Sequence, residues 1–465
     1  MLKIGAQRVP SKILLLVVSD SLSVILGLLL AVSVRFYASG TVVEHLDAWQ
    51  TAARFLIVVL VCEFSLYYND LYASEVMNRR SQLLVRLLQS LGVACLALSF
   101  LYYIEPGLSL GRGIAALAAP TILWLTVATR MVLDKTGLFF RGPERVLILG
   151  TGPAGLELAR EIITRPELHV KVVGFLDEKG ENIGKSLINP GIIGAANDVE
   201  AIVSREKIDR VVLALAERRG CTPVPQLLHL KFAGVRVEDA YSCYERFTGR
   251  ILLERLSPSW LILSDGFRKS AVLLAAKRAI DVMSSLVLLL LALPVMVLTA
   301  LAIWLETGSP VLFCQTRVGL RGKPFQILKF RSMYQNAEAE GPRWAVEGDR
   351  RITRVGRFIR KVRFDELPQL INVLRGEMSL VGPRPELPHF CSLLEQQIPF
   401  FNQRHAVRPG VTGWAQIKYQ YGSSVEDAKA KLELDLFYIK NLSIMLDLAI
   451  IFETAKVMLM RRGAK

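Results

Sequence analysis

Long apolar runs dominate the first third of the chain and predict membrane-spanning helices. The runs cover residues 13–34, 53–68, 83–104 and 113–133, with short polar segments between them. Each run is close to the ~20 residues that a helix needs to cross a bilayer. We therefore expect residues 1–140 to form a transmembrane domain, a bundle of four helices, in a multi-pass membrane protein.

Basic residues beside these runs predict the orientation of the domain. They precede the first run, lie in the second connection and follow the fourth run: Lys3, Arg8 and Lys12; Arg79, Arg80 and Arg86; Lys135, Arg141 and Arg145. Because Lys and Arg concentrate in cytoplasmic loops, both ends of this domain are expected in the cytoplasm. Glu63 lies inside the second run, where a hydrogen bond between helices is favoured over a functional acid.

A fifth apolar run, residues 282–305, is long enough to span the membrane but contains Pro294 near its centre. An interior proline removes one helical hydrogen bond, and basic residues flank this run on both sides, which favours a cytoplasmic position for both ends. We therefore predict a re-entrant helix that enters the inner leaflet, breaks near residues 293–294 and returns. Ser285 is expected to help satisfy the freed backbone groups. A straight span with a mild kink is the alternative.

Between the membrane segments the pattern changes to short buried strands that alternate with helices. Gly150, Gly152 and Gly155 follow the first strand at the spacing of a Rossmann unit, just before a helix begins. Three strands are predicted, over residues 145–149, 172–177 and 209–215. We therefore expect a Rossmann-like α/β middle domain over residues 141–265.

The sequence leaves open whether this middle domain binds a nucleotide. Asp177 ends the second strand, where an acid can contact a ribose, so Asp177 and the three glycines are nucleotide-binding candidates. The same glycines also suit tight packing of a helix on a strand, and Pro153 removes one amide that could hold phosphate. No Tyr-x-x-x-Lys sequence follows, so catalysis by this domain is not expected.

A basic amphipathic helix is predicted directly before a pair of carboxylates. Apolar residues recur at i, i+3, i+4 and i+7 with basic residues around them: Val355, Phe358, Ile359 and Val362; Arg354, Arg357, Arg360, Lys361 and Arg363. Such a helix is suited to lie on an anionic membrane surface. Asp365 and Glu366 follow at once, so we expect them at the depth of the lipid head groups, where a lipid phosphate would lie.

The adjacent Asp365 and Glu366 are candidates for chemistry because neighbouring side chains face different ways and can take separate roles. In a basic setting one carboxylate can attack phosphorus while the other holds a metal or orients its neighbour. A solvated pair that caps a helix is the ordinary alternative.

Composition and charge favour a membrane protein with an anionic or phosphorylated partner. The chain is 52% hydrophobic, with a mean hydropathy of +0.37 and a net charge of +15. Residues 317–363 hold 13 Lys and Arg against 4 Asp and Glu, a net +9. Nucleic acid is disfavoured, since no helix-turn-helix, zinc or single-strand-binding pattern accompanies this charge. The six cysteines are scattered without a Cys-x-x-Cys pair, so neither a disulfide framework nor a zinc site is indicated.

Six blocks in the C-terminal part carry a resemblance to a known family. They are Gln315-Thr-Arg317-Val-Gly319, Lys329-Phe-Arg331-Ser-Met, Asp365-Glu366-Leu-Pro-Gln-Leu-Ile-Asn-Val, Gly382-Pro-Arg384-Pro, Arg408-Pro-Gly-Val-Thr-Gly-Trp414-Ala-Gln416 and Asp435-Leu-Phe-Tyr438-Ile-Lys-Asn441. From about Lys277 onward the chain resembles the bacterial sugar transferases, the polyprenyl-phosphate hexose-1-phosphate transferases that begin exopolysaccharide and O-antigen assembly. The long form of that family also carries a membrane bundle and a Rossmann-like middle domain. Leu442 stands where many members carry Trp, which we regard as neutral.

The resemblance implies an enzyme that transfers a hexose-1-phosphate from a UDP-hexose to undecaprenyl phosphate and releases UMP, with Mg²⁺ as cofactor. It assigns the nucleophile to Asp365, which would form an aspartyl-phosphosugar intermediate. Glu366 receives a supporting role linked to the metal, and both carboxylates are the expected metal site.

Several basic residues are candidates to bind the phosphates of the substrates: Lys329, Arg331, Arg384, Arg404 and Arg408. Arg384 lies between two prolines, and this stiff segment suits a fixed bidentate clamp. For Arg331, a salt bridge to Glu377 or a head-group contact is an equal alternative.

Three further residues near these blocks carry open interpretations. His405 could assist proton transfer, although a structural role is favoured. Trp414 and Tyr419 could stack on uracil or seat the lipid, and a packing role is equally favoured.

The resemblance also implies location and partners. The C-terminal catalytic domain, residues 266–465, would be cytoplasmic and monotopic, anchored to the bacterial inner (cytoplasmic) membrane by the re-entrant helix and amphipathic surface helices. Its partners would be a UDP-hexose, undecaprenyl phosphate and membrane lipids, with no nucleic acid; a homodimer is left open. Two other classes compete: a membrane scaffold or regulator with a nucleotide-sensing Rossmann domain, and a membrane-bound nucleotide-sugar dehydratase. The intact Asp-Glu pair disfavours the first, and the missing Tyr-x-x-x-Lys disfavours the second.

Overall fold

The computed structural model describes most of the chain. The described residues are 2–4, 7–9, 11–39, 48–72, 80–135, 143–178, 180–186, 188–215, 222–253, 264–335, 349, 351–419, 422 and 424–459. Arg79 and Arg141, which contributed to the predicted orientation, lie outside these residues. Two short antiparallel strands, β1 (Leu2–Ile4) and β2 (Gln7–Val9), open the chain.

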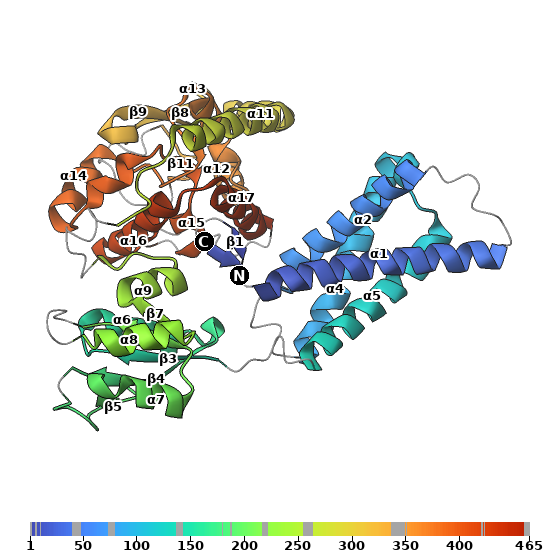
Figure 1. Cartoon of the computed structure of the whole chain (residues 1–465). Helices are drawn as coiled ribbons and strands as arrows, with labels where there is room; N and C mark the ends of the chain where they lie inside the picture. Colours follow the sequence, from blue (N-terminus) through green and yellow to red (C-terminus); the bar gives the residue numbers. More distant parts are fainter. Residues whose placement is uncertain are drawn as a thin grey trace.

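Among the described residues that follow in the N-terminal part, four long apolar helices lie side by side (Figure 1). They are α1 (Ser11–Ser39), α2 (Ala48–Tyr68), α4 (Arg80–Ile104) and α5 (Arg112–Lys135), with a 3-10 turn η1 (Pro106–Leu108) before α5. With the later helix α11 (Ala271–Thr307), they give five helices of the length and composition to cross a membrane among the residues described. The predicted apolar runs are thus helices, as a membrane protein requires.

Buried polar side chains join these helices. Arg130 of α5 donates from Nη2 to Oδ2 of Asp20 on α1 over 2.6 Å, and both residues are buried. Glu63 of α2 accepts hydrogen bonds from Ser21 at 2.8 Å and from Tyr72 at 2.6 Å. The predicted hydrogen bond between helices at Glu63 is therefore confirmed.

The middle domain is a parallel sheet with helices on both faces. Its strand order is β5-β4-β3-β6-β7, with bounds β3 (Glu144–Leu149), β4 (Val170–Asp177), β5 (Ile192–Ala195), β6 (Arg210–Leu213) and β7 (Arg236–Asp239). Helices α6 (Pro153–Thr164) and α9 (Ala240–Thr248) pack on one face, and α7 (Val199–Glu206) and α8 (Val224–Phe232) pack on the other. Two 3-10 turns, η2 (Pro166–Leu168) and η3 (Ala196–Asp198), complete it. The predicted parallel α/β sheet is confirmed.

The C-terminal part combines one long apolar helix with short strands and helices around a shared core (Figure 1). After α11 come β8 (Leu312–Val318), η5 (Leu320–Gly322), β9 (Pro324–Phe330), α12 (Arg354–Lys361), η6 (Phe364–Glu366), α13 (Gln369–Arg375), β10 (Ser379–Val381), α14 (Pro388–Gln397), η7 (Phe401–Ala406), β11 (Gly410–Thr412), α15 (Trp414–Lys418), α16 (Val425–Asn441) and α17 (Ile444–Leu459). Strands β8 and β9 form an antiparallel hairpin, and β10 pairs with β11 in parallel.

Helix α11 runs without interruption through Pro294. The predicted interruption near residues 293–294 is therefore absent from the described helix, because a helix can accommodate one missing hydrogen bond with a bend. Ser285 is fully buried, and its hydroxyl has no hydrogen-bond partner among the described residues. Ser285 thus does not satisfy a freed backbone group, contrary to the sequence-based expectation.

The C-terminal part contacts both other regions. Ile251 and Leu253, which follow the middle domain, pack into the C-terminal core. On the side of the membrane helices, the Tyr67 hydroxyl at the end of α2 donates to Glu453 of α17 at 2.8 Å. Lys456 of α17 pairs with Asp70 close by.

Candidate active site

A sharp turn after helix α12 places the carboxylate pair. The Thr353 hydroxyl caps the helix by accepting a hydrogen bond from the Gly356 amide at 2.8 Å. Beyond the helix, Arg363 has a left-handed backbone with a φ of 61° and turns the chain into η6. Asp365 and Glu366 lie on that short turn, so their side chains point to different surroundings.

Glu366 lies among three basic side chains. Its Oε1 accepts hydrogen bonds from Lys329 Nζ at 3.3 Å and from Arg384 Nη2 at 3.0 Å, and Arg363 Nη1 lies 3.8 Å from Oε2. Burial alone would raise the pKa of Glu366, but the charges of Arg384, Lys329 and Arg363 hold it well below its usual range. Glu366 is therefore ionised, and it draws Lys329 and Arg384 toward one point.

Asp365 has the opposite character. It is buried, and its Oδ1 has no hydrogen-bond partner within the described part of the chain. Burial, followed by the charge of Glu366, raises the pKa of the Asp365 carboxyl, while nearby Lys329 and Arg360 act against the shift. One carboxylate is thus fixed by cations, and its neighbour offers an unpaired oxygen beside them.

Lys329 reaches the pair from strand β9, which a buried asparagine holds in place. Burial lowers the pKa of the Lys329 ammonium, and the charge of Glu366 opposes this. Asn372 of α13 accepts from the Leu328 amide at 3.0 Å and donates to the Gln326 carbonyl at 2.7 Å. Sequence reasoning assigned no role to Asn372, although its place in the same block as the carboxylates was an available signal.

Arg331, a predicted phosphate ligand, caps the end of helix α11. Its Nη2 donates to the carbonyl oxygens of Thr307 at 3.0 Å and Gly308 at 2.7 Å, at the end of α11. Its Nε and Nη1 are buried without a hydrogen-bond partner among the described residues. The carboxylate of Glu377, the partner considered from sequence, accepts a hydrogen bond from Asn372 at 2.6 Å.

Arg404 and Arg408 also have main-chain partners. Arg408 donates from Nε to the carbonyl of Gly376 at 3.0 Å, at the end of α13. Arg404 is buried against Asp435, with Nη2 2.8 Å from Oδ2, and the same nitrogen donates to the main-chain oxygen of Arg384 at 3.0 Å. Among the predicted phosphate ligands, the structure therefore brings Lys329 and Arg384 to the carboxylate pair.

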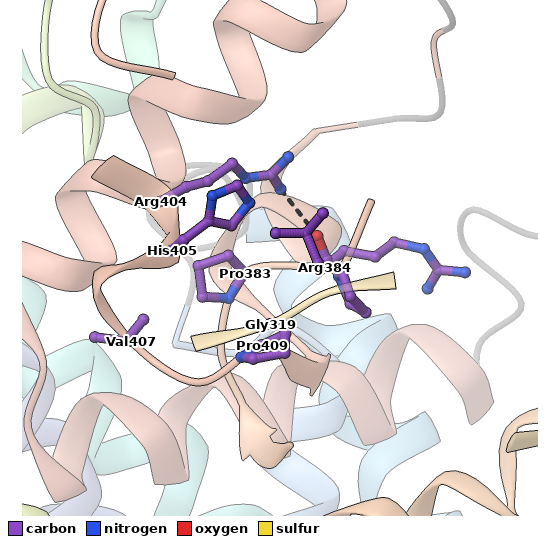
Figure 2. Close-up of a pocket in the computed structure, with 9 residues that line it drawn as sticks. Gly319, Pro383, Arg384, Arg404, His405, Val407 and Pro409 are labelled. Atoms are coloured by element: carbon purple, nitrogen blue, oxygen red, sulfur yellow. Dashed lines mark hydrogen bonds between the residues drawn. The ribbon is translucent and has the colours of Figure 1, made fainter. Parts of the chain in front are cut away.

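A small hollow lies on the other side of the Arg384 segment. Nine residues line it: Val318, Gly319, Pro383, Arg384, Pro385, Arg404, His405, Val407 and Pro409. Figure 2 shows Arg404 and His405 on one side, while the Arg384 side chain extends away from them. Burial, together with the charge of Arg404, lowers the pKa of His405 to about 4. His405 is therefore neutral near pH 7.

Trp414 and Tyr419 contact protein groups. The buried Trp414 indole donates from Nε1 to the carbonyl of Gly249 at 2.9 Å and stacks on Phe437. The Tyr419 hydroxyl donates to Asp427 at 2.7 Å. For Trp414 the packing interpretation holds, since it ties the C-terminal core to the end of the middle domain.

The glycine-rich turn of the middle domain packs closely on Ala214, the residue that follows strand β6. A Cβ on Gly150 would lie 2.8 Å from the Ala214 backbone, and one on Gly155 would lie 2.6 Å from the Ala214 Cβ. Gly152 precedes α6 and donates to the Ala214 carbonyl at 3.2 Å. Asp177 is buried and accepts from the amide and side chain of Asn182 at 3.4 and 3.3 Å. Packing and a local turn thus account for these four residues.

A metal at the carboxylate pair would depend on substrate oxygens. Among the described residues, no group of three or more His, Cys, Asp or Glu side chains is arranged to hold a metal. Asp365 offers the unpaired Oδ1, and Glu366 binds Lys329 and Arg384 through Oε1, while its Oε2 lies 3.8 Å from Arg363. Mg²⁺ is commonly held by one or two carboxylates plus substrate phosphates, and the pair fits that arrangement.

Comparison with known proteins identifies the family. The bacterial sugar transferase family matches residues 272–461, and a family described as a CoA-binding domain matches residues 68–222. An *Aeromonas hydrophila* UDP-N-acetylgalactosamine-undecaprenyl-phosphate N-acetylgalactosaminephosphotransferase is 44% identical over 48% of this chain and 52% of its own length. A *Komagataeibacter xylinus* undecaprenyl-phosphate glucose phosphotransferase is 37% identical over 72% of this chain and 62% of its own.

For a third relative, the matched region covers most of this chain and most of the relative. A *Klebsiella pneumoniae* UDP-glucose:undecaprenyl-phosphate glucose-1-phosphate transferase is 32% identical over 70% of this chain and 71% of its own length. The chain belongs to the bacterial sugar transferase family. It spans 52% and 62% of the length of the first two relatives.

Proposed function

We propose that this protein transfers a hexose-1-phosphate from a UDP-sugar to undecaprenyl phosphate, releasing UMP, as the first membrane step of exopolysaccharide or O-antigen synthesis. One observation carries the proposal. The ionised Glu366 gathers Lys329 and Arg384 beside Asp365, whose Oδ1 has no partner in the described part of the chain. Cations around an unpaired carboxylate oxygen suit an attack on a phosphate. The names of the relatives support the same reaction.

The proposed chemistry has two displacements at one phosphorus. An oxygen of Asp365 attacks the β-phosphorus of the UDP-sugar, and the bond to the oxygen that bridges the two phosphates breaks. UMP leaves with that electron pair, and a sugar-phosphoryl-aspartate remains. An oxygen of undecaprenyl phosphate then attacks the same phosphorus and restores the carboxylate. Lys329 and Arg384 stabilise the charge on the phosphoryl oxygens.

The cofactor in this proposal is Mg²⁺, which the carboxylate pair would hold together with the diphosphate of the substrate. It would offset the negative charge of the phosphates as they enter a site that already contains two carboxylates. Glu366 supports the site in a second way that needs no metal, because it orients Lys329 and Arg384.

We further propose that α11 is re-entrant and that the catalytic domain lies in the cytoplasm. Both ends of α11 contact the same part of the molecule. Arg278 donates to the carbonyl of Val373 at 2.6 Å, and the Thr307 carbonyl accepts from Arg331 at 3.0 Å. Asn372, next to Val373, bonds strand β9, which leads into Arg331. A straight helix from Arg278 to Thr307 would be about 44 Å long. The contacts from Arg278 through Asn372 and strand β9 to Thr307 involve only a few residues, so they favour a helix that is bent and brings its two ends closer together.

The surface of α12 supports attachment to a membrane. Ile359 packs inward against Ile303 and Phe330, whereas Phe358 is 60% exposed beside the exposed Arg357. An exposed phenylalanine among basic side chains suits a surface of anionic lipids. The proposed location is therefore the bacterial inner membrane, with four crossings before the middle domain.

The scaffold and dehydratase alternatives lose support. The region that matches the sugar transferase family contains both carboxylates and the basic residues around them. An intact site of this kind favours an enzyme over a scaffold. For the middle domain we propose a role in assembly, since Gly150, Gly155 and Asp177 are engaged by protein groups.

The test is UMP release by the purified full-length protein in detergent, with a panel of UDP-sugars and Mg²⁺, with and without undecaprenyl phosphate. We expect release with one or a few sugars and formation of a lipid diphosphate sugar that requires the lipid. Absence of a lipid-linked product with every sugar and nucleotide tried would refute the proposal.

A further inference from the structure

Two side chains from different helices donate hydrogen bonds to one carbonyl oxygen, that of Val381. Lys277 of α11 reaches it from Nζ at 3.1 Å, and the Tyr438 hydroxyl of α16 reaches it at 3.0 Å. Asp447 of α17 accepts from both donors: Lys277 at 2.6 Å on Oδ2 and Tyr438 at 2.8 Å on Oδ1. The three side chains and the carbonyl form a closed set of four contacts, in which the single hydroxyl proton of Tyr438 is shared between the Val381 carbonyl and Asp447.

This cluster is buried and charged. The side chains of Lys277 and Asp447 are 11% and 10% exposed, and Tyr438 is 1% exposed. Burying two ions is unfavourable unless their geometry and additional hydrogen bonds compensate. Here two contacts converge on one main-chain oxygen and the other two on Asp447, so the cluster fixes a position as well as pairing charges.

The fixed carbonyl lies three residues before Arg384, on a segment with little freedom. The Gly382 amide donates to the Thr412 carbonyl at 2.9 Å, and the Pro383 carbonyl accepts from the Gly410 amide at 2.9 Å. A Cβ on Gly382 would lie 2.4 Å from the Arg408 carbonyl. Because proline also restricts φ, a shift at Val381 is passed on to Arg384.

The long apolar helix holds the same strand at a second point. Asp281, one turn after Lys277 on α11, accepts from the Ser379 hydroxyl at 2.7 Å and from the Leu380 amide at 3.1 Å. Strand β10 is therefore attached to α11 through both a lysine and an aspartate on one helix face. The proposed membrane anchor and the strand leading to Arg384 are joined directly.

We propose that Lys277, Asp447 and Tyr438 are positioning residues for the transfer reaction. They hold the Val381 carbonyl, and through it they set where the Arg384 guanidinium meets Glu366 and the substrate phosphates. Asp447 is the centre of the cluster, since it orients both donors. This inference rests on the proposed function, because it concerns how the phosphate-binding Arg384 is placed. It goes further because it gives three residues outside the site a role in positioning Arg384 within the site.

The test is a double-mutant cycle that pairs Tyr438→Phe with Arg384→Lys, measured as kcat/KM for UMP release. Tyr438→Phe removes one hydroxyl and keeps the ring. A small misplacement of a phosphate-binding group can reduce turnover by roughly 10- to 100-fold, and we expect a loss of that size. In the Arg384→Lys background the same change should have less than about a threefold effect, because the group it positions is already altered.

A matched control separates positioning from loss of stability. Tyr244→Phe removes a hydroxyl from another buried tyrosine, in the middle domain, and should leave kcat/KM unchanged in both backgrounds. Additive effects of Tyr438→Phe and Arg384→Lys, or a Tyr438→Phe protein as active as Tyr244→Phe, would overturn the inference. If Tyr438→Phe melts too low to assay, Asp447→Asn takes its place in the cycle with Arg384→Lys. A coupled result would again support the inference, and an additive result would overturn it.

Failure of the inference differs from failure of the proposed function. An unaltered protein that forms no lipid-linked product refutes the function itself. An active unaltered protein with an additive cycle refutes the positioning role alone.

Discussion

Arg404 donates a hydrogen bond to the main-chain oxygen of Arg384 over 3.0 Å, so one arginine supports the backbone of the other. Both had been candidates to hold phosphate. The guanidinium of Arg404 is instead buried against Asp435, while that of Arg384 reaches Glu366. The same residue type thus has two functions a short distance apart: one arginine faces the proposed reaction, and the other shapes the segment that presents it.

This arrangement predicts a large loss of stability in Asp435→Asn. The change leaves the Arg404 charge buried without its carboxylate, and breaking a buried ion pair costs about 3–5 kcal/mol. We expect a clearly lower melting temperature in detergent. Arg160→Gln removes an exposed pair with Glu157 and should change stability by less than about 0.5 kcal/mol. Equal melting temperatures for the two variants would contradict the supporting role of Arg404.

The proposed nucleophile gives a second prediction. Asp365→Asn should reduce UMP release by roughly 10³-fold or more while the melting temperature stays near that of the unaltered protein, since the change is nearly isosteric. Glu366→Gln should also lower turnover strongly, because it removes the charge that orients Lys329 and Arg384, and it should alter the dependence on Mg²⁺. Near-normal turnover in Asp365→Asn would exclude the covalent mechanism.

A third prediction concerns the bend proposed for α11. Pro294→Ala restores the missing hydrogen-bond donor and should let the helix straighten toward a full span. Trp304 is 55% exposed, so Trp304→Cys provides a site for an impermeant thiol reagent added to intact cells. The protein without the added cysteine gives the background labelling. Trp304→Cys should be labelled above this background only when Pro294→Ala is also present. Strong labelling with Pro294 in place would show that the helix already crosses the membrane.

The neutral His405 predicts a pH dependence of stability. Its pKa falls from 6.5 to about 4 on folding, so between these values the unfolded chain takes up a proton that the folded protein does not. Stability should therefore decrease as pH falls from about 6.5 toward 4. His405→Gln should flatten the melting-temperature profile in this window, and substitution of the exposed His229 should not. Parallel profiles for all three proteins would argue against a buried neutral imidazole.

The contacts of residues 249–253 predict how truncations behave. A protein that starts near Phe267 keeps the carboxylate pair, α11 and α12, and should still form the lipid diphosphate sugar. It lacks Ile251 and Leu253, and losing large buried side chains costs about 2–5 kcal/mol each. A protein that starts near Thr248 should therefore melt higher at similar activity. An inactive but folded Phe267 protein that regains activity with an added middle domain would make that domain part of the catalytic machinery.

Much of the architecture was predictable because it follows from regular spacing. Uniformly apolar runs gave the helices around Asp20 and Arg130, and a strand followed by Gly150 and Gly155 gave the parallel sheet. In the site, the blocks that contain Lys329, Arg384 and Glu366 resemble one family, and the structure brings these three side chains together; phosphate binding by the two cations stays a prediction.

The partners that the structure gives to the remaining basic residues could not be predicted, because they are not visible in a linear sequence. The carbonyls of Thr307 and Gly376 accept from Arg331 and Arg408, and any residue type could supply a carbonyl. The position of Ile359 had a similar cause: the apolar face of α12 is partly covered by Ile303, from a helix that ends nearly fifty residues earlier in the sequence. Charge and periodicity indicate whether a helix face is apolar or polar, whereas the tertiary fold determines which residues pack against that face.

The contact between α2 and α17 affects how the protein is made. Tyr67 and Glu453 are 386 residues apart in the sequence, and Lys456 meets Asp70 at the same place. At synthesis rates of about 5–20 residues per second, roughly 20–80 s pass between the appearance of the two sides. During that interval Tyr67 and Asp70 are without Glu453 and Lys456. Helix α17 joins α2 only after this interval, so a ribosome that stops before α17 releases a chain without this contact.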